Sequence, residues 1–185
     1  YYYLNKEVVV TKAGELFERA IQDAEELLER FDSEKNGPCS HNSESLKRAG
    51  MVLTLAAWET YVKDRFQEEI EVWLFSVKGS QIGGFVQRKV TEDLKRFFNP
   101  NTAKTKQLFK SYFDIDITES WKWDNYHPPQ AKKVLDQLIS LRGDAAHQAN
   151  TSVTQSHIVK RDDLDKAIRF IKGLVSATEK LKIAK

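Results

Sequence analysis

The chain has 185 residues, a length that suits one domain with a full hydrophobic core. Apolar residues make up 41% of it and charged residues 30%, which excludes a collagen-like, low-complexity or wholly disordered chain. The 29 Lys and Arg nearly balance the 27 Asp and Glu, so the formal charge of +2 does not indicate nucleic-acid binding, and only the local distribution of charge can do so.

Residues 11–31 carry apolar side chains at spacings of three and four, which predicts an amphipathic helix with an acidic outer face. The loop predicted next, at residues 36–43, contains Cys39 and His41. Two such side chains are a weak indication of a metal site. Because Cys39 is the only cysteine and no second pair completes a tetrahedral site, we expect an ordinary connection and no metal.

Residues 43–75 are predicted to form one long helix, with a candidate kink at Gly50. Its stretch 51–58 is apolar nearly all round, which is typical of a helix buried between others. Three glycines follow this helix: Gly79, Gly83 and Gly84. Glycines are typical of a phosphate loop, but the Gly-Lys-Ser/Thr sequence of such a loop is absent. The glycines are therefore predicted to form a turn between two helices.

Two shorter helices are predicted at residues 85–98 and 102–113, separated by an Asn-Pro-Asn stop. Seven bases and two acids lie between Phe85 and Tyr112, a local charge of +5 that contrasts with the −5 of the first helix. The aromatic, irregular stretch 114–129 is expected to form either a short helical turn packed on the body or a lid.

Helices at residues 131–141 and 161–181 complete the prediction, and no strand is required anywhere. The sequence therefore predicts an all-α bundle with long antiparallel helices and additional short ones. We expect a single domain over 1–185, in which 1–40 form an N-terminal helix and loop and 41–182 form the core bundle.

Histidine is suited to proton transfer at neutral pH, and of the four histidines only His147 lies near a candidate partner, Arg142. In an unbroken helix, residues five apart are separated by about 140° around the axis and about 7.5 Å along it. The two can act on one substrate only if the helix ends or bends near Gly143, or if a second copy of the chain supplies the other half. A surface arginine and an unrelated, hydrogen-bonded histidine are the alternative.

Residues 142–147, Arg-Gly-Asp-Ala-Ala-His, fit an R-x4-6-H motif, and the motif follows an apolar helix and precedes a long terminal one. In these features the chain resembles the HEPN superfamily, the higher eukaryotes and prokaryotes nucleotide-binding domain. The buried stretch 53–62 is similar to the first core helix of the RiboL-PSP or MAE-type branch. The resemblance covers roughly residues 40–182. It implies an all-helical homodimer in which the motifs of both subunits face each other across a cleft.

Many members of this superfamily are metal-independent ribonucleases of toxin–antitoxin, anti-phage and other stress systems. The resemblance thus implies an endoribonuclease that uses the 2′-OH of the RNA as nucleophile, leaves a 2′,3′-cyclic phosphate and needs no cofactor. His147 is expected to move protons, and Arg142 to bind phosphate oxygens and offset developing charge. Asp144 is expected to orient His147 or hold Arg142. Glu59 is a candidate to reach the cleft from the buried helix, with a capped or surface carboxylate as the alternative.

The local basic residues are expected to follow the RNA backbone, with a solvated helix face as the alternative. They are Arg88, Lys89, Lys95, Arg96, Lys104, Lys106 and Lys110. The alternative function is a non-catalytic helical module that binds RNA or a partner protein through the same cleft. Expected partners are RNA, a second copy of the chain, and an antitoxin or sensor protein.

No apolar run approaches the 18 or so residues of a membrane-spanning helix. The first residues also lack the basic-then-apolar form of a signal peptide. We therefore expect no membrane association and a cytoplasmic protein.

Overall fold

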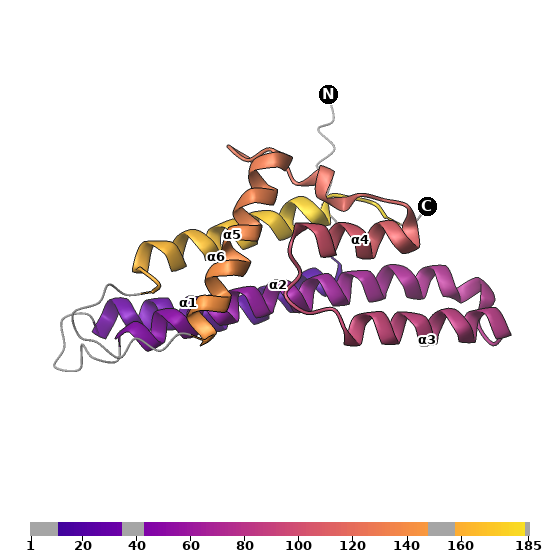
Figure 1. The fold of residues 1–185 in the computed structure, drawn as a ribbon, viewed down its shortest axis with the longest axis horizontal. Coiled ribbons are helices and arrows are strands. Elements are labelled where there is room, and N and C mark those ends of the chain that lie inside the picture. Colours follow the sequence, from indigo (N-terminus) through magenta and orange to yellow (C-terminus); the bar gives the residue numbers. More distant parts are fainter. Residues whose placement is uncertain (1–10, 35–42, 148–157, 184–185) are drawn as a thin grey trace, which may run out of the picture.

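The computed structural model describes residues 11–34, 43–147 and 158–183. Within these ranges the chain forms six α-helices and two short 3₁₀ helices and has no strand, which confirms the all-α prediction. The arrangement of the helices is shown in Figure 1.

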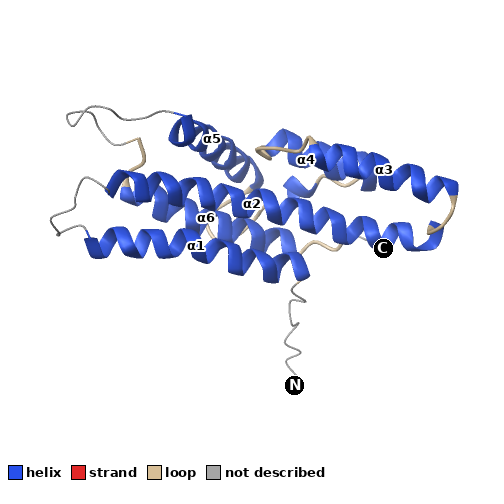
Figure 2. Ribbon diagram, turned by 90° about the horizontal axis from the view of Figure 1, so that it is seen from below, coloured by secondary structure: helices blue, strands red, loops and turns tan. Residues whose placement is uncertain are grey.

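Three long helices form the main core: α1 (Lys12–Glu34), the first half of α2 (Ser43–Leu74) and α6 (Arg161–Glu179). They run side by side in both views (Figures 1 and 2). Helices α1 and α6 are antiparallel, because Thr11 at the start of α1 bonds to Glu179 at the end of α6. At the opposite end, Asp32 pairs with Arg161. The core between the three helices is apolar and includes Phe17, Ile21, Leu55, Trp58, Leu164 and Ile171.

The second half of α2 extends beyond this core and returns as α3 (Gln81–Lys95) through the 3₁₀ helix η2 (Phe75–Val77) (Figure 1). The prediction that the turn extends to Gly84 is wrong, because α3 already includes Gly83 and Gly84. Ser80 caps α3 by accepting a hydrogen bond from the Gly83 amide, 3.0 Å away. A Cβ at position 83 would lie 2.3 Å from the Val77 carbonyl oxygen. Gly83 therefore permits a close approach and does not break the helix.

The aromatic stretch after α4 (Thr102–Phe113) packs on the body and is not a lid. After the 3₁₀ helix η3 (Ile117–Ser120), Trp121 is fully buried and donates from Nε1 to the Thr178 hydroxyl at 3.1 Å. The rings of Trp123 and Tyr126 stack at 4.8 Å and both contact Phe170 of α6. Of the two alternatives for this stretch, the packed turn is correct.

Helix α5 (Pro128–His147) crosses α2 (Figure 1) and is longer at both ends than the predicted 131–141. It begins at two prolines, which are tolerated in a first turn because their missing amides have no intrahelical acceptor there. It also continues through the segment 142–147, which was expected to lie beyond the helix. The reason is that the buried face of the helix continues through this segment. Its residues recur at spacings of three and four: Ala131, Leu135, Leu138, Arg142 and Ala145.

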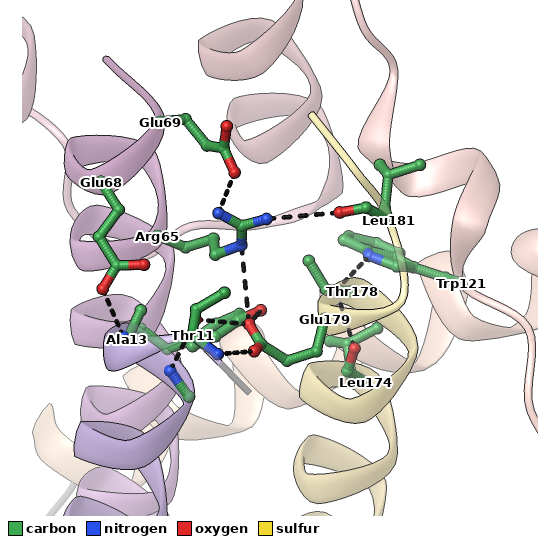
Figure 3. A network of polar contacts seen from close by, with 12 residues as sticks. Thr11, Ala13, Arg65, Glu68, Glu69, Trp121, Leu174, Thr178, Glu179 and Leu181 are labelled. Carbon is green, nitrogen blue, oxygen red and sulfur yellow. Dashed lines mark hydrogen bonds and ion pairs between the residues drawn. The ribbon is translucent and has the colours of Figure 1, made fainter. Parts of the chain in front are cut away.

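A buried polar cluster joins the start of α1 and the end of α6 to the middle of α2 (Figure 3). The Glu179 carboxylate accepts hydrogen bonds from the Thr11 amide at 2.8 Å, the Thr11 hydroxyl at 3.0 Å and the Tyr61 hydroxyl at 2.7 Å. Arg65 Nε lies 3.6 Å from the same carboxylate, and the other guanidinium nitrogens bind Glu69 and the Leu181 carbonyl. We call Thr11, Tyr61, Arg65, Glu69 and Glu179 the Glu179 clamp.

Burial and the neighbouring Glu179 carboxylate raise the pKa of Tyr61 well above its ordinary value, because both disfavour a phenolate. A second carboxylate, Glu68, accepts from the Ala13 amide at 2.7 Å. The first turn of α1 is thus capped by carboxylates from two other helices, which matches the positive end of a helix dipole.

Candidate functional site

Arg142 and His147 lie in the last two turns of one continuous helix, α5. Because this helix ends at His147, the alternative in which it ends near Gly143 does not apply. The two positions are therefore separated by about 140° around a single helix axis. The side chain of His147 lies outside the described part of the structure, so only its backbone position is given.

Arg142 is partly buried, because it occupies a position of the stripe that packs toward α2. Its Nε is shielded from solvent and makes no hydrogen bond with any described residue. A shielded donor without an acceptor costs about 1–3 kcal/mol. An oxyanion placed beside this guanidinium would relieve that cost through a charge-assisted hydrogen bond.

Arg48 of α2 is a second arginine at the motif, and the sequence analysis did not identify it. Its Nε donates to the Ala145 carbonyl at 2.8 Å. That carbonyl is among the last four of α5, which have no intrahelical donor, so Arg48 caps the helix and places a cation at the negative end of its dipole. No sequence pattern indicates this contact, because the two residues are 97 positions apart.

The start of α2 is also tied to the segment before α6. Glu44 accepts a hydrogen bond from the Ile158 amide at 3.0 Å. Lys47 is buried, with Nζ 4.8 Å from the centre of the Phe31 ring. Burial lowers the pKa of Lys47, while the carboxylates of Glu44 and Asp163 act to raise it. We call this region, formed by the first turns of α2, the last two turns of α5 and the start of α6, the motif end.

Asp144 and Glu59, the two supporting candidates, lie in different places. Asp144 is exposed on the motif segment itself. Glu59 accepts from Lys63 Nζ at 2.8 Å and from the Asn99 amide at 3.0 Å, so its carboxylate fixes the connection between α3 and α4. Along α2 it follows Arg48 by eleven residues, or about 16 Å. The structure thus does not bring Glu59 to the motif end, and catalytic roles for both carboxylates stay predictions.

The seven basic candidates do not form one patch. Lys89, Arg96 and Lys104 line a groove of about 610 Å³ between α3 and α4. Lys106 forms an ion pair with Asp116 at 2.6 Å. The other three are exposed outside the groove and make no hydrogen bond or ion pair with residues that the structure describes: Arg88, Lys95 and Lys110.

Among the described side chains, no group of three or more His, Cys, Asp and Glu is placed to hold a metal ion. Cys39 and His41 lie outside the described residues. None of the described helices is both long and apolar enough to cross a membrane.

Comparison of the chain with curated proteins and with solved structures finds no match. The family model described as RiboL-PSP-HEPN matches residues 19–181, a range that includes the core helices, the α3–α4 groove and the Arg142–His147 segment. The match covers far more than half of the chain, and it agrees with the all-helical fold. The chain therefore belongs to the RiboL-PSP-HEPN family, which indicates a nuclease-like or RNA-related module.

Proposed function

We propose that this protein is a metal-independent endoribonuclease whose site is formed by Arg142 and His147. The observation that carries the proposal is the family match, because its range includes an Arg-x4-His segment on the last two turns of α5. The solvent-shielded Nε of Arg142, which makes no hydrogen bond with a described residue, supports it, since such a group is suited to a phosphate oxygen.

The chemistry needs only groups that the chain and the RNA supply. The ribose 2′-OH loses its proton and attacks the adjacent phosphorus; the P–O5′ bond breaks, and the 5′-oxygen takes up a proton. The products are a 2′,3′-cyclic phosphate and a 5′-OH. His147 acts in proton transfer, which contributes about 10²–10⁴-fold. Arg142 binds phosphate oxygens and stabilises the charge that develops on the five-coordinate phosphate.

The site is completed by a second copy of the chain. Because α5 is continuous, positions 142 and 147 are about 140° apart, and one helix does not direct both residues at one phosphate. A two-fold pair places Arg142 of one copy beside His147 of the other, and such symmetric dimers are the commonest oligomers. Arg48 binds the Ala145 carbonyl and so fixes the last turn of α5, which carries His147 in this proposal.

The biological setting that fits such a nuclease is a toxin–antitoxin, anti-phage or other stress system in the cytoplasm. The activity of an unrestrained ribonuclease requires control, so an antitoxin or sensor protein is proposed as a further partner. The basic residues that line the groove between α3 and α4 contact the RNA backbone in this proposal, and the affinity for RNA falls as the salt concentration rises.

The test is RNA cleavage by the purified chain in EDTA, followed by mass spectrometry of the fragments. We expect fragments with a 2′,3′-cyclic phosphate and a 5′-OH, and no cleavage where the ribose at the cut site is 2′-deoxy. His147→Ala and Arg142→Met should each abolish cleavage. Arg142→Met retains an unbranched apolar side chain at this packing position while the charge is lost.

A 3′-OH product, or cleavage only after divalent metal is restored, would contradict the mechanism. Light scattering tests the dimer separately, and a monomer at tens of micromolar would contradict the shared site. If the wild-type chain binds RNA but never cleaves it, the non-catalytic binding module is the correct interpretation.

A further inference from the structure

The groove between α3 and α4 has a net positive lining. Lys89 and Arg96 come from α3 and Lys104 from α4, and Asp93 is the only acid among the described residues that line it. Asp93 accepts hydrogen bonds from Lys89 at 2.5 Å and from the Tyr112 hydroxyl at 2.7 Å. Partial burial acts to raise the pKa of Asp93, but these two hydrogen bonds, together with the charges of Lys89 and Arg96, outweigh it and hold the pKa below its usual value.

Two cations of the groove make no ion pair with a described residue. The side chain of Arg96 makes no hydrogen bond within the described part of the chain, and its charge acts on Asp93 only at longer range. Lys104 Nζ donates to the Phe98 carbonyl, at 2.6 Å, and to no acidic side chain among the described residues, so its charge is not neutralised. The excess charge of the groove therefore fits a ligand that carries at least two negative charges.

The groove also has an apolar side, which a compact inorganic anion would not use. Phe97, Leu108 and Tyr112 line it together with the cations. On α3, Phe85 precedes Lys89 by four residues and so lies on the same face one turn earlier. The Phe85 side chain is 63% exposed, although exposing an aromatic ring to water is unfavourable. A ligand that fits this groove would thus present apolar faces as well as negative charge.

We propose that this groove, extended by Phe85, is a binding site for single-stranded RNA. A single strand exposes both phosphates and base faces, and bases stack on aromatic side chains in sites of this kind. A duplex keeps its bases stacked inward and offers mainly its backbone and groove edges, so it would leave the apolar side of the groove unused. This binding proposal rests on the proposed function in one respect: the proposed ribonuclease activity is the reason for taking the strand to be RNA.

The position of the groove suits delivery of a strand to the motif. At the Lys104 end, the Thr102 amide donates to Asp136 at 2.8 Å and the Thr102 hydroxyl to the Lys132 carbonyl at 3.1 Å. These bonds fix the start of α4 against α5. A strand that leaves the groove at this end meets α5 at Lys132 and Asp136, and Asp136 lies about 9 Å along the helix from Arg142.

The test is fluorescence anisotropy with a short labelled single-stranded RNA, in EDTA and in the His147→Ala background. Replacing both Arg96 and Lys104 with Ala should weaken binding about 10-fold or more and reduce the slope of log K against log salt by about 1.4, which corresponds to two lost phosphate contacts. The matched control replaces Lys95 and Lys110 with Ala, since both are exposed and lie outside the groove. It should change the affinity by less than about 3-fold.

Phe85→Ala should weaken binding about 5- to 100-fold with no change in the salt slope, the effect of losing one stacked base. Phe75→Ala is its control. Phe75 is 80% exposed, but it lines a different pocket, beside Gly79 and Gln87. Circular dichroism verifies that each variant is folded. Arg96→Ala alone serves as a second variant, because this side chain makes no bond within the described structure that its loss would break.

An equal loss of RNA affinity in the Arg96/Lys104 and Lys95/Lys110 double variants would overturn the proposal, since binding would then follow the overall charge of the protein. Equal affinity for duplex and single-stranded RNA would overturn it as well, as would dimer dissociation by the groove variants, which would assign the groove to a second copy. Binding that meets these expectations without any cleavage by the wild-type chain would uphold the groove and contradict only the proposed nuclease activity.

Discussion

The two ends of the three-helix core both bring charged residues of α2 to the ends of other helices, but they pair these charges differently. In the Glu179 clamp, one carboxylate accepts three hydrogen bonds and the arginine beside it has acceptors on two of its nitrogens. At the motif end, the shielded Nε of Arg142 makes no hydrogen bond with a described residue, and Arg48 Nε donates to a backbone carbonyl. Arg65 Nε likewise makes no hydrogen bond, but it lies 3.6 Å from the Glu179 carboxylate, whereas neither Arg142 nor Arg48 forms an ion pair within the described residues. The clamp thus pairs its charges with one another, whereas in the proposed function the cations of the motif end bind a ligand.

The largest expected effect separates activity from stability at the motif end. His147→Ala and Arg142→Met should each reduce RNA cleavage by at least about 10³-fold, because proton transfer or phosphate stabilisation is lost. The free energy of unfolding, measured in urea, should stay within about 1 kcal/mol of wild type or rise for Arg142→Met, since a shielded donor without an acceptor is removed. A large loss of stability in either variant would mean that the motif end is structural.

The clamp should show the opposite pattern. Glu179→Ala leaves two Thr11 donors, the Tyr61 hydroxyl and Arg65 without their shared acceptor. We expect the free energy of unfolding to fall by about 3–5 kcal/mol, because three partly buried donors lose their acceptor and Arg65 loses one of its two carboxylate partners. Cleavage per folded molecule should not change. Glu179→Gln retains an acceptor oxygen, so its stability should fall less. Equal losses of stability in the two variants would mean that hydrogen bonds to residue 179 do not stabilise the clamp.

Tyr61→Phe should lower the free energy of unfolding less than Glu179→Ala does, and the size of its effect should depend on pH. At neutral pH the loss of one hydrogen bond to a buried carboxylate should cost about 1–2 kcal/mol. The folded pKa of Tyr61 is raised, so its contribution is fully present below the unfolded pKa of about 10 and is lost as the pH rises above it. Urea unfolding at increasing alkaline pH should therefore show a steeper decline for wild type than for Tyr61→Phe. Parallel declines would exclude Tyr61 as the source.

The smallest effect is expected from Arg48→Met, which removes the cap on the Ala145 carbonyl. We expect a loss of about 0.5–1 kcal/mol, typical of a cation at a helix C-terminus. Arg19→Met is the control, because Arg19 is exposed on α1 and should change stability by less than about 0.5 kcal/mol. If Arg48→Met also lowers the cleavage rate per folded molecule, Arg48 contributes to the proposed site as well as to the stability of the fold.

The periodic helices were predictable because burial leaves a regular apolar pattern in the sequence. The bounds of α4 were predicted to the residue, and those of α2 to within one. The extension of α5 was missed because a charged residue, Arg142, occupies a stripe position, where its long aliphatic stem can pack while its head keeps the charge. Gly83 was misjudged because a close approach to the Val77 carbonyl cannot be inferred from composition.

The site was predictable only in part. The Arg142–His147 spacing is visible in the sequence, but the cap from Arg48 joins residues far apart and depends on how α2 crosses α5. All seven bases were expected to follow the RNA backbone, whereas the structure divides them between a groove and other faces. Local charge can thus be counted along a sequence, but which side chains share a surface depends on the packing of the two helices.

The clamp has a further consequence for how this protein can be attached to other polypeptides. Thr11 bonds to Glu179, and the Leu181 carbonyl binds Arg65, so the chain enters α1 and leaves α6 at the same place. The last turns of α5 lie away from that place, beside the start of α2. Any tag or fused domain joined before Thr11 or after Ile183 is therefore tethered at the clamp, and a linker there does not have to pass the last turns of α5. Fusions at either terminus should leave the proposed pairing through α5 unobstructed.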